Sequence, residues 1–209
     1  MVKHLVSTTV LPMAVGESFT DYKAIPDAFE KLDVFGLEFA FLPEWSPDRS
    51  PLGRTAADWE NCPKPSYEDL TDILEDIPTS TVHINRDVGD MLCSKDKHMV
   101  ERGKTTLEDN LAAAEKLGSD VAVIHLWDTR AEHLDLEDLW KKVEVITERY
   151  DQISIAVEIV PISAEKLYVE KAWRELDSLM PEKHGFTLDL NWCSFYDNFS
   201  DLKPLEIEF

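Results

Sequence analysis

The chain has 209 residues, of which 44% are hydrophobic and 30% charged, so it can bury a sizeable core, and we expect a single domain spanning residues 1–209. It is strongly acidic, with 42 acidic against 21 basic side chains and a net charge of −21. Such a field repels phosphate backbones, which excludes nucleic acid as a partner, and no apolar run reaches the roughly 18 residues of a membrane-spanning helix.

The cysteines and the N-terminal residues bear on the cellular location of the protein. Cys62, Cys93 and Cys193 are odd in number and widely spaced, and no CxxC pair occurs. We therefore expect no disulfides and predict a cytoplasmic protein. The first 15 residues contain a Lys and a short apolar stretch but no convincing cleavage site, so we interpret them as a strand and not as a signal peptide.

Strand-like and helix-like segments alternate from the N-terminus onwards. The first are a strand at Lys3–Val10, a helix from about Asp21 to Leu32 and a strand at Val34–Phe41. A Pro-rich loop comes next, over Leu42–Pro65, and loops of this length in compact domains are usually functional or disordered. Its aromatic and basic residues are Trp45, Arg49, Arg54 and Trp59. They could cover the mouth of a site and contact an anionic substrate, or only pack on the surface.

The same alternation continues through the second half of the chain. The predicted helices begin at Ser66, Thr106, Asp135 and Ser163. Gly118 stands where the second of these needs a C-terminal cap. The predicted strands are Thr79–Asn85, Val121–Leu126, Ile153–Ile159, Gly185–Leu190 and, as a last apolar run, Pro204–Phe209.

Alternating strands and helices predict a parallel sheet with right-handed crossovers. A barrel is favoured over a doubly wound sheet because no glycine-rich loop comes after the first strand. A complete (β/α)₈ barrel takes about 250 residues, and here the pattern stops at the seventh strand. We therefore predict an α/β fold, a TIM-type (β/α) barrel that is incomplete or irregular, with about seven parallel strands. An open edge invites pairing with another chain, so we also predict a homodimer.

Five of the strands carry a metal-competent side chain near the carboxyl end. These residues are Glu38, His83, His125, Glu158 and Asp189. Because the carboxyl ends of parallel barrel strands converge on one face, we expect these side chains to form one site. Carboxylate and imidazole ligands suit Zn²⁺ or Mn²⁺, whereas an all-oxygen set suits Mg²⁺. These residue types could therefore hold a divalent metal, Zn, Mn or Mg, as a cofactor.

Four of these five residues could also have a purely structural role in the fold. His83 and His125 could be core histidines that are hydrogen-bonded to backbone carbonyls. Glu158 and Asp189 sit in very apolar segments, where a carboxylate without a partner is costly, so a metal, an Arg or a Lys should lie close to each. The sequence alone leaves both interpretations open.

Five motifs occur in a fixed order between about Val34 and Leu190. They are GLEFAF, VHINRD, DNLAAAEKLGSDVAVIHLW, ISIAVEIVP and GFTLDLNW. In this order they resemble the xylose isomerase-like TIM-barrel superfamily, which includes sugar isomerases, sugar-phosphate epimerases and the endonuclease IV type of repair enzyme. The resemblance implies metal binding at the strand ends and a small-molecule substrate, a carbohydrate.

The resemblance also implies roles for individual residues. Glu158 and Asp189 match metal-binding strand-end carboxylates, and His83 and His125 match the two strand-end histidines of the endonuclease-like branch. We expect all four to be metal ligands, and Glu158 and His125 to be catalytic through proton transfer. The residues that we expect to bind substrate are Glu38, Arg86, Trp127 and Asn191.

The sequence departs from the superfamily pattern in ways that leave three functions open. Trp192 stands where a His often comes after the aspartate, Glu206 aligns with a metal-binding His, and the eighth strand is absent. Our leading hypothesis is a metal-dependent sugar or sugar-phosphate isomerase or epimerase with a partly degenerate site. The alternatives are a non-catalytic barrel that binds a small molecule or a partner protein, and a metal-dependent hydrolase, a phosphoesterase.

Overall fold

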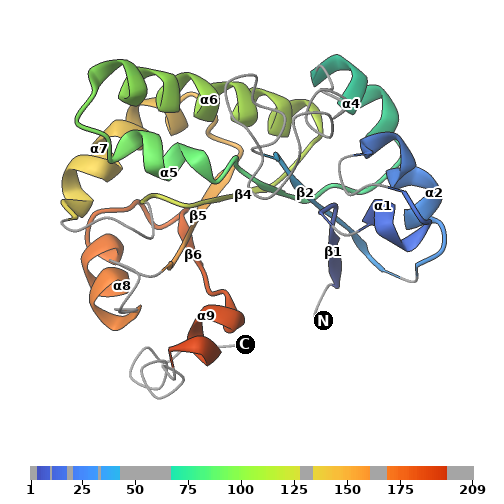
Figure 1. Ribbon diagram of the computed structural model, residues 1–209. Coiled ribbons are helices and arrows are strands. Elements are labelled where there is room, and N and C mark those ends of the chain that lie inside the picture. Colours follow the sequence, from blue (N-terminus) through green and yellow to red (C-terminus); the bar gives the residue numbers. More distant parts are fainter. Residues whose placement is uncertain are drawn as a thin grey trace.

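A parallel six-stranded sheet forms the centre of the protein (Figure 1). The computed structural model describes residues 4–9, 11–17, 21–32, 34–42, 67–127, 134–160 and 169–196. The strands lie side by side in their chain order. They are β1 (Leu5–Ser7), β2 (Gly36–Ala40), β3 (Thr81–His83), β4 (Val121–Ile124), β5 (Ser154–Glu158) and β6 (Gly185–Thr187). The predicted α/β fold with parallel strands is therefore confirmed.

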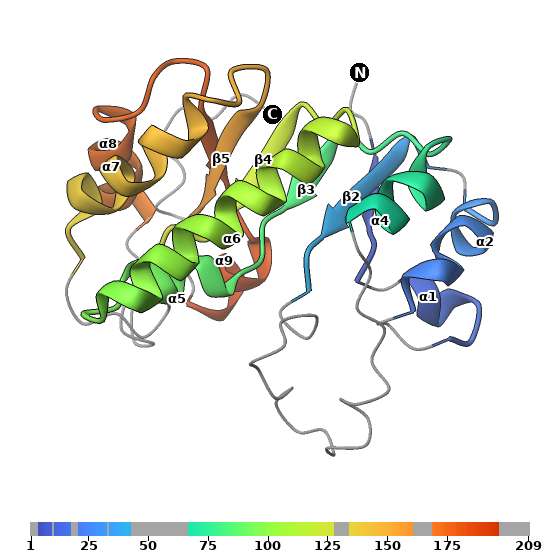
Figure 2. The same cartoon turned by 90° about the horizontal axis from the view of Figure 1, so that it is seen from above.

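Helices alternate with the strands, and most of them lie along the outer side of the curved sheet, whereas α9 (Leu190–Phe195) lies beyond the end of β6 (Figure 1). The long helix α6 (Lys97–Lys116) runs across the outer side of β3 and β4, with α5 (Asp87–Leu92) beside it (Figure 2). In chain order the helices are α1 (Leu11–Ala14), η1 (Tyr22–Ala24), α2 (Ile25–Phe29), α4 (Tyr67–Leu74), α5 (Asp87–Leu92), α6 (Lys97–Lys116), α7 (Leu136–Thr147), α8 (Val169–Asp177) and α9 (Leu190–Phe195). None of the described helices is long and apolar enough to cross a membrane.

The two faces of the sheet differ in chemistry because side chains alternate along each strand. The outer face is apolar and buried under the helices, as at Leu37, Phe39, Val82 and Val157. The inner face carries the polar side chains of the strands, among apolar ones such as Val121 and Val123. The polar residues are Ser7, Glu38, Thr81, His83, Ser154, Glu158 and Thr187. The core therefore lies between sheet and helices, and the inner face is left for a site.

The barrel is not closed within the described residues. Among the strands of the described residues, β1 pairs only with β2 and β6 pairs only with β5, so these two strands are the ends of the described sheet. The predicted strand at 204–209, with Glu206, lies outside the described residues, and so do the loop residues Trp45, Arg49, Arg54 and Trp59. The expectation of an incomplete barrel agrees with this open arrangement.

Several element boundaries differ from the predicted ones. Helix α6 begins at Lys97, whereas we predicted a start at Thr106. The carboxylate of Asp96 accepts a hydrogen bond from the backbone N–H of His98 at 2.9 Å, which satisfies a free donor and starts the helix nine residues earlier. The short helices α1 and α5 were not predicted. The caps at Asp135 and at Gly118, where φ is +69°, are confirmed.

Candidate metal centre

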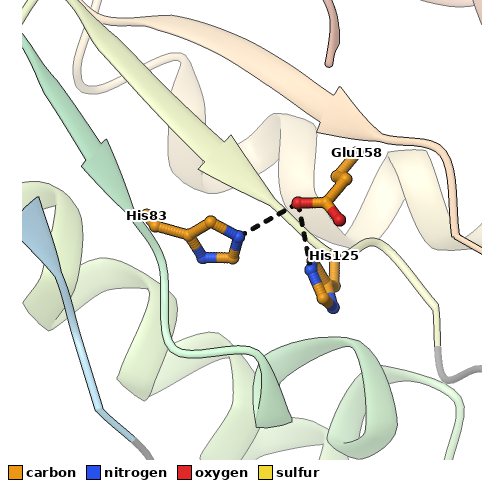
Figure 3. Close-up of side chains that lie close together, drawn as sticks. All are labelled: His83, His125 and Glu158. Carbon is orange, nitrogen blue, oxygen red and sulfur yellow. Dashed lines mark hydrogen bonds and ion pairs between the residues drawn. The ribbon is translucent and has the colours of Figure 1, made fainter. Parts of the chain in front are cut away.

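Three of the predicted residues meet at the carboxyl ends of neighbouring strands. His83 is the last residue of β3, His125 comes directly after β4, and Glu158 is the last residue of β5. His83 lies in register with Val123, and His125 stands two residues further on, so both face the inner side of the sheet. Their three side chains point toward one another (Figure 3).

One carboxylate oxygen lies between the two imidazole rings. Oε2 of Glu158 is 3.1 Å from Nε2 of His83 and 3.2 Å from Nε2 of His125. The rings meet edge to face, with centroids 5.0 Å apart and planes at 72°. The ligand atoms of the three residues all lie within 4.8 Å of one another, the separation expected of groups that could share one ion.

The backbone fixes which nitrogen of His83 faces the site. Nδ1 of this ring lies 2.9 Å from the carbonyl oxygen of Ile84, so Nδ1–H donates to that oxygen. Nε2 then presents a lone pair to the site unless it is also protonated. A ring nitrogen held in this way by a backbone carbonyl is typical of metal-binding histidines. Two imidazole nitrogens and one carboxylate oxygen form a donor set that suits Zn²⁺, Mn²⁺ or Fe²⁺.

The charges in the site depend on each other. Glu158 is only 7% exposed, and burial alone would raise the pKa of its carboxyl group. Hydrogen bonds from His125 and His83 outweigh burial and lower that pKa to about 2. Burial is the largest single effect on His83 and disfavours its charged form. The hydrogen bond and the charge of Glu158, together with smaller contributions from Ile84 and Glu38, outweigh burial and raise the pKa of His83. Without metal, the Glu158 carboxylate therefore favours the protonated form of the His83 imidazole.

A buried polar network holds the residues just after His83. The backbone N–H of Ile84 donates to the carbonyl of Val123 at 2.8 Å. The amide oxygen of Asn110, on α6, accepts from the backbone N–H of Asn85 at 3.0 Å. Asn110 is buried, and we did not predict its role from the sequence. The available signal was a polar residue next to Leu111, within the apolar stripe of the helix.

Structural comparison finds proteins that share the fold of this chain. No protein-family model matches the sequence, and no curated protein sequence matches it. D-allulose 3-epimerase from Methylomonas sp. matches 94% of this chain and 67% of its own, with a TM-score of 0.61 at 16% identity. A sugar phosphate isomerase/epimerase from Parabacteroides distasonis matches 98% of this chain and 74% of its own, with a TM-score of 0.56 at 15% identity.

An L-ribulose 3-epimerase gives a similar result, matching 95% of this chain and 64% of its own, with a TM-score of 0.58 at 15% identity. The chain has the fold of the xylose isomerase-like TIM barrels. It spans about two thirds of the length of the allulose and ribulose epimerases. At this level of identity the likeness shows the fold, and the chemistry must be argued from the site.

Within this fold Asp189 lies apart from the three-residue cluster. It is the N-cap of α9, where Oδ1 accepts a hydrogen bond from the backbone N–H of Asn191 at 2.7 Å. Oδ2 has no hydrogen bond or ion pair with another described residue. The side chain is partly exposed and stands two residues after Thr187, which pairs with Glu158. The cap uses one oxygen and leaves the other for a further role.

The residues predicted to bind substrate are spread over the barrel. Glu38 lies on the inner face of β2, opposite Thr81, and its charge contributes to the raised pKa of His83. Arg86 is exposed where α5 begins, and Asn191 is exposed in α9. Trp127 is only 1% exposed, and its indole N–H donates to the carbonyl of Val160 at 3.3 Å. Its contacts are therefore those of a core residue.

Proposed function

We propose that the protein is a metal-dependent isomerase or epimerase that acts on a small carbohydrate. The observation that carries the proposal is the meeting of His83, His125 and Glu158 at the carboxyl ends of three parallel strands. This is the end of a barrel where active sites form. The fold is shared with several sugar epimerases, one of which, the Methylomonas enzyme, is known in complex with D-allulose.

His83, His125 and Glu158 would hold the metal. The two imidazoles favour Zn²⁺ or Mn²⁺ over Mg²⁺, which prefers oxygen ligands and keeps its waters. Asp189 is our candidate for a fourth ligand through Oδ2. When bound, such a metal supplies a Lewis acid that polarises a substrate carbonyl, so that a proton leaves the neighbouring carbon more readily.

The two predicted catalytic residues, Glu158 and His125, then have different roles. A carboxyl group whose pKa is about 2 is a weak base, so Glu158 is better suited to hold a metal than to remove a proton from carbon. We therefore assign the proton transfer mainly to His125. Its side chain is about one fifth exposed and so is within reach of a ligand in the barrel.

Glu38 is our candidate for recognising the sugar hydroxyls. Its carboxylate is half-buried on the inner face and forms no hydrogen bond or ion pair with another described residue. Buried carboxylates normally find donors, and the hydroxyl groups of a polyol supply them. Arg86 and Asn191 are candidates for contacts at the rim.

Elemental analysis of protein purified without chelator tests the metal, and a turnover assay tests the reaction. We expect about one Zn or Mn per chain and interconversion of ketohexoses such as D-allulose and D-fructose. The Glu158→Gln variant should lose both the metal and turnover. Wild-type protein that contains no stoichiometric transition metal, and whose thermal unfolding does not shift on metal addition, would contradict the proposal.

One observation supports a second candidate function. A site with two imidazoles and one carboxylate also suits a metal that activates water for hydrolysis. The net charge of −21 opposes nucleic acid as the substrate, so a small phosphoester is the candidate. Turnover of a chromogenic phosphomonoester or phosphodiester, with no activity on ketoses, would favour the hydrolase.

A further inference from the structure

We propose that Gly89 is a positioning residue for the metal centre. Gly89 lies in α5, and its missing side chain allows this helix to rest directly on the backbone that carries His125. The inference rests on the proposed function, because it concerns the geometry of a metal ligand. It assigns a role to a residue that touches neither metal nor substrate.

The close approach is between backbone atoms. A Cβ atom at Gly89 would lie 2.6 Å from the carbonyl oxygen of His125, 2.8 Å from the carbonyl oxygen of Trp127 and 2.9 Å from its carbonyl carbon. Carbon atoms cannot stay this close to such neighbours, and a backbone carbonyl cannot rotate away as a side chain can. Any side chain at this position must therefore move either α5 or the His125–Trp127 segment.

Helix α5 has little room to retreat. Its outer side packs against α6, where a Cβ atom at Gly103 would already lie 2.9 Å from Cβ of Met91. Nζ of Lys142, on α7, donates to the carbonyl of Leu92 at 3.0 Å and holds the end of α5. The helix is thus confined between α6, α7 and the end of β4. Displacement caused by a new methyl group at Gly89 must fall at least partly on His125.

A small displacement matters because the site is tight. Nε2 of His125 is 3.2 Å from Oε2 of Glu158, and the three ligand atoms share one small space. Sites of this kind work only within about 0.5 Å of their geometry. Changes to groups that orient metal ligands typically weaken metal binding by about 10-fold to 100-fold, and we expect a loss in that range for Gly89→Ala.

Gly36 provides a matched control. A Cβ atom at Gly36 would lie 2.4 Å from the carbonyl oxygen of Pro78, so Gly36→Ala creates the same kind of clash with backbone. Gly36 is the first residue of β2, at the amino end of the sheet, whereas the candidate site lies at the carboxyl end. Gly36→Ala should destabilise the fold without moving a ligand.

The experiment compares the Zn²⁺ affinity of wild-type protein, Gly89→Ala and Gly36→Ala by competition with a chromophoric chelator. The Co²⁺ absorption spectrum of each reports the ligand geometry. We expect weaker Zn²⁺ binding and an altered Co²⁺ spectrum for Gly89→Ala only. Equal losses in the two variants, or no loss in either, would overturn the inference. Wild-type protein that binds neither ion would instead refute the proposed metal centre.

If Gly89→Ala does not fold, a milder variant tests whether α5 positions His125. Lys142→Met removes the contact that holds the end of α5 and should weaken Zn²⁺ binding in the same direction, by a smaller factor. Lys141→Met is its control. Each lysine forms an ion pair with a carboxylate on its own helix, Lys142 with Asp138 and Lys141 with Glu137, but among the described residues Lys141 has no contact with α5. Identical Zn²⁺ affinities in these two lysine variants and wild type would overturn the positioning role of α5.

Discussion

Oε2 of Glu158 lies 3.1 Å from Nε2 of His83, although β4 separates the strands that carry the two residues. Because Nδ1–H of His83 already donates to the carbonyl of Ile84, Nε2 can donate to the carboxylate only when the ring is protonated. The metal-free site therefore stores a proton at the place where a metal would bind. A divalent cation and this proton compete for the same nitrogen.

Metal binding should consequently release a proton from His83. The contact with Glu158 raises the pKa of His83, so the ring keeps its proton to a higher pH than a free imidazole does, and Zn²⁺ must displace that proton. We expect Zn²⁺ binding to release protons, in a larger number per ion at about pH 6 than at about pH 8, and an affinity that increases with pH. Calorimetric titrations in buffers of different ionisation enthalpy measure the proton count. The exposed His98 is the control, since His98→Gln should leave the count unchanged. A count of zero in wild type would contradict this view of the site.

The same pair gives the metal-free protein a particular dependence of stability on pH. The raised pKa of His83 stabilises the fold below pH 6.5, and this contribution is lost as the pH rises through the folded-state value. The lowered pKa of Glu158 stabilises the fold above pH 4.5, and this contribution is lost as the pH falls toward 2. The pair should therefore contribute most between about pH 4.5 and 6.5.

The Glu158→Gln variant removes the carboxylate. The stability of the metal-free variant should therefore depend less on pH, both below about pH 4.5 and above about pH 6.5, than the stability of wild type. We expect it to lower the free energy of unfolding of metal-free protein by about 2 kcal/mol near pH 5.5, as for a hydrogen bond to a charged group. The loss should be smaller near pH 8. Urea unfolding across this pH range provides the measurement. A pH-independent difference between variant and wild type would mean that the loss comes from packing.

The sequence was sufficient to find the three clustered residues because parallel strands bring their carboxyl ends together. It was not sufficient to rank them. Asp189 looked equivalent to Glu158, since both come after apolar residues, yet Glu158 is buried against two imidazoles and Asp189 caps a helix. That difference depends on the conformation of the residues after each strand, and a short helix such as α9 leaves little periodic signal.

The fold was predictable at the level of alternating strands and helices and less so at the level of boundaries. The α6 start was misplaced because Thr106-Leu-Glu-Asp109 has the form of a capping box, although in the structure it lies inside the helix. Helix α5 was missed because six residues are too few to show helical periodicity. Its position depends on Gly89, whose close approach to the His125 segment is a tertiary contact.

Substitutions at Asp189 separate its two candidate roles. Asn is as good an N-cap as Asp, so Asp189→Asn should keep the stability of the fold. If Oδ2 is a ligand, this variant should still bind Zn²⁺ more weakly than wild type, though less weakly than Glu158→Gln. Asp189→Ala should additionally lose about 1 kcal/mol of stability with the cap. Chelator competition and urea unfolding measure the two effects. Unchanged Zn²⁺ affinity in Asp189→Asn would show that Asp189 is a cap alone.

His184, which lies outside the candidate metal centre, should make the stability of the fold sensitive to acid. His184 precedes β6, and its Nδ1 accepts a hydrogen bond from the backbone N–H of Ile155 at 3.0 Å. The ring packs edge to face against Trp140, with centroids 5.4 Å apart. Burial, with a smaller contribution from Lys183, lowers the pKa of His184 to about 4. Protonation would replace the acceptor with a donor and break the bond to β5.

The free energy of unfolding should therefore fall as the pH drops from 6.5 to 4, because the unfolded chain binds the His184 proton at a higher pH than the folded chain. Asn at position 184 offers an oxygen acceptor that does not titrate in this range, so His184→Asn should lose less stability over the same interval. We expect the two profiles to diverge by on the order of 2 kcal/mol at pH 4, with solvent screening taken into account. Urea unfolding of metal-free protein at several pH values measures this, and His98→Gln should behave as wild type does. Parallel profiles for wild type and His184→Asn would show that the hydrogen bond to Ile155 survives protonation or contributes nothing.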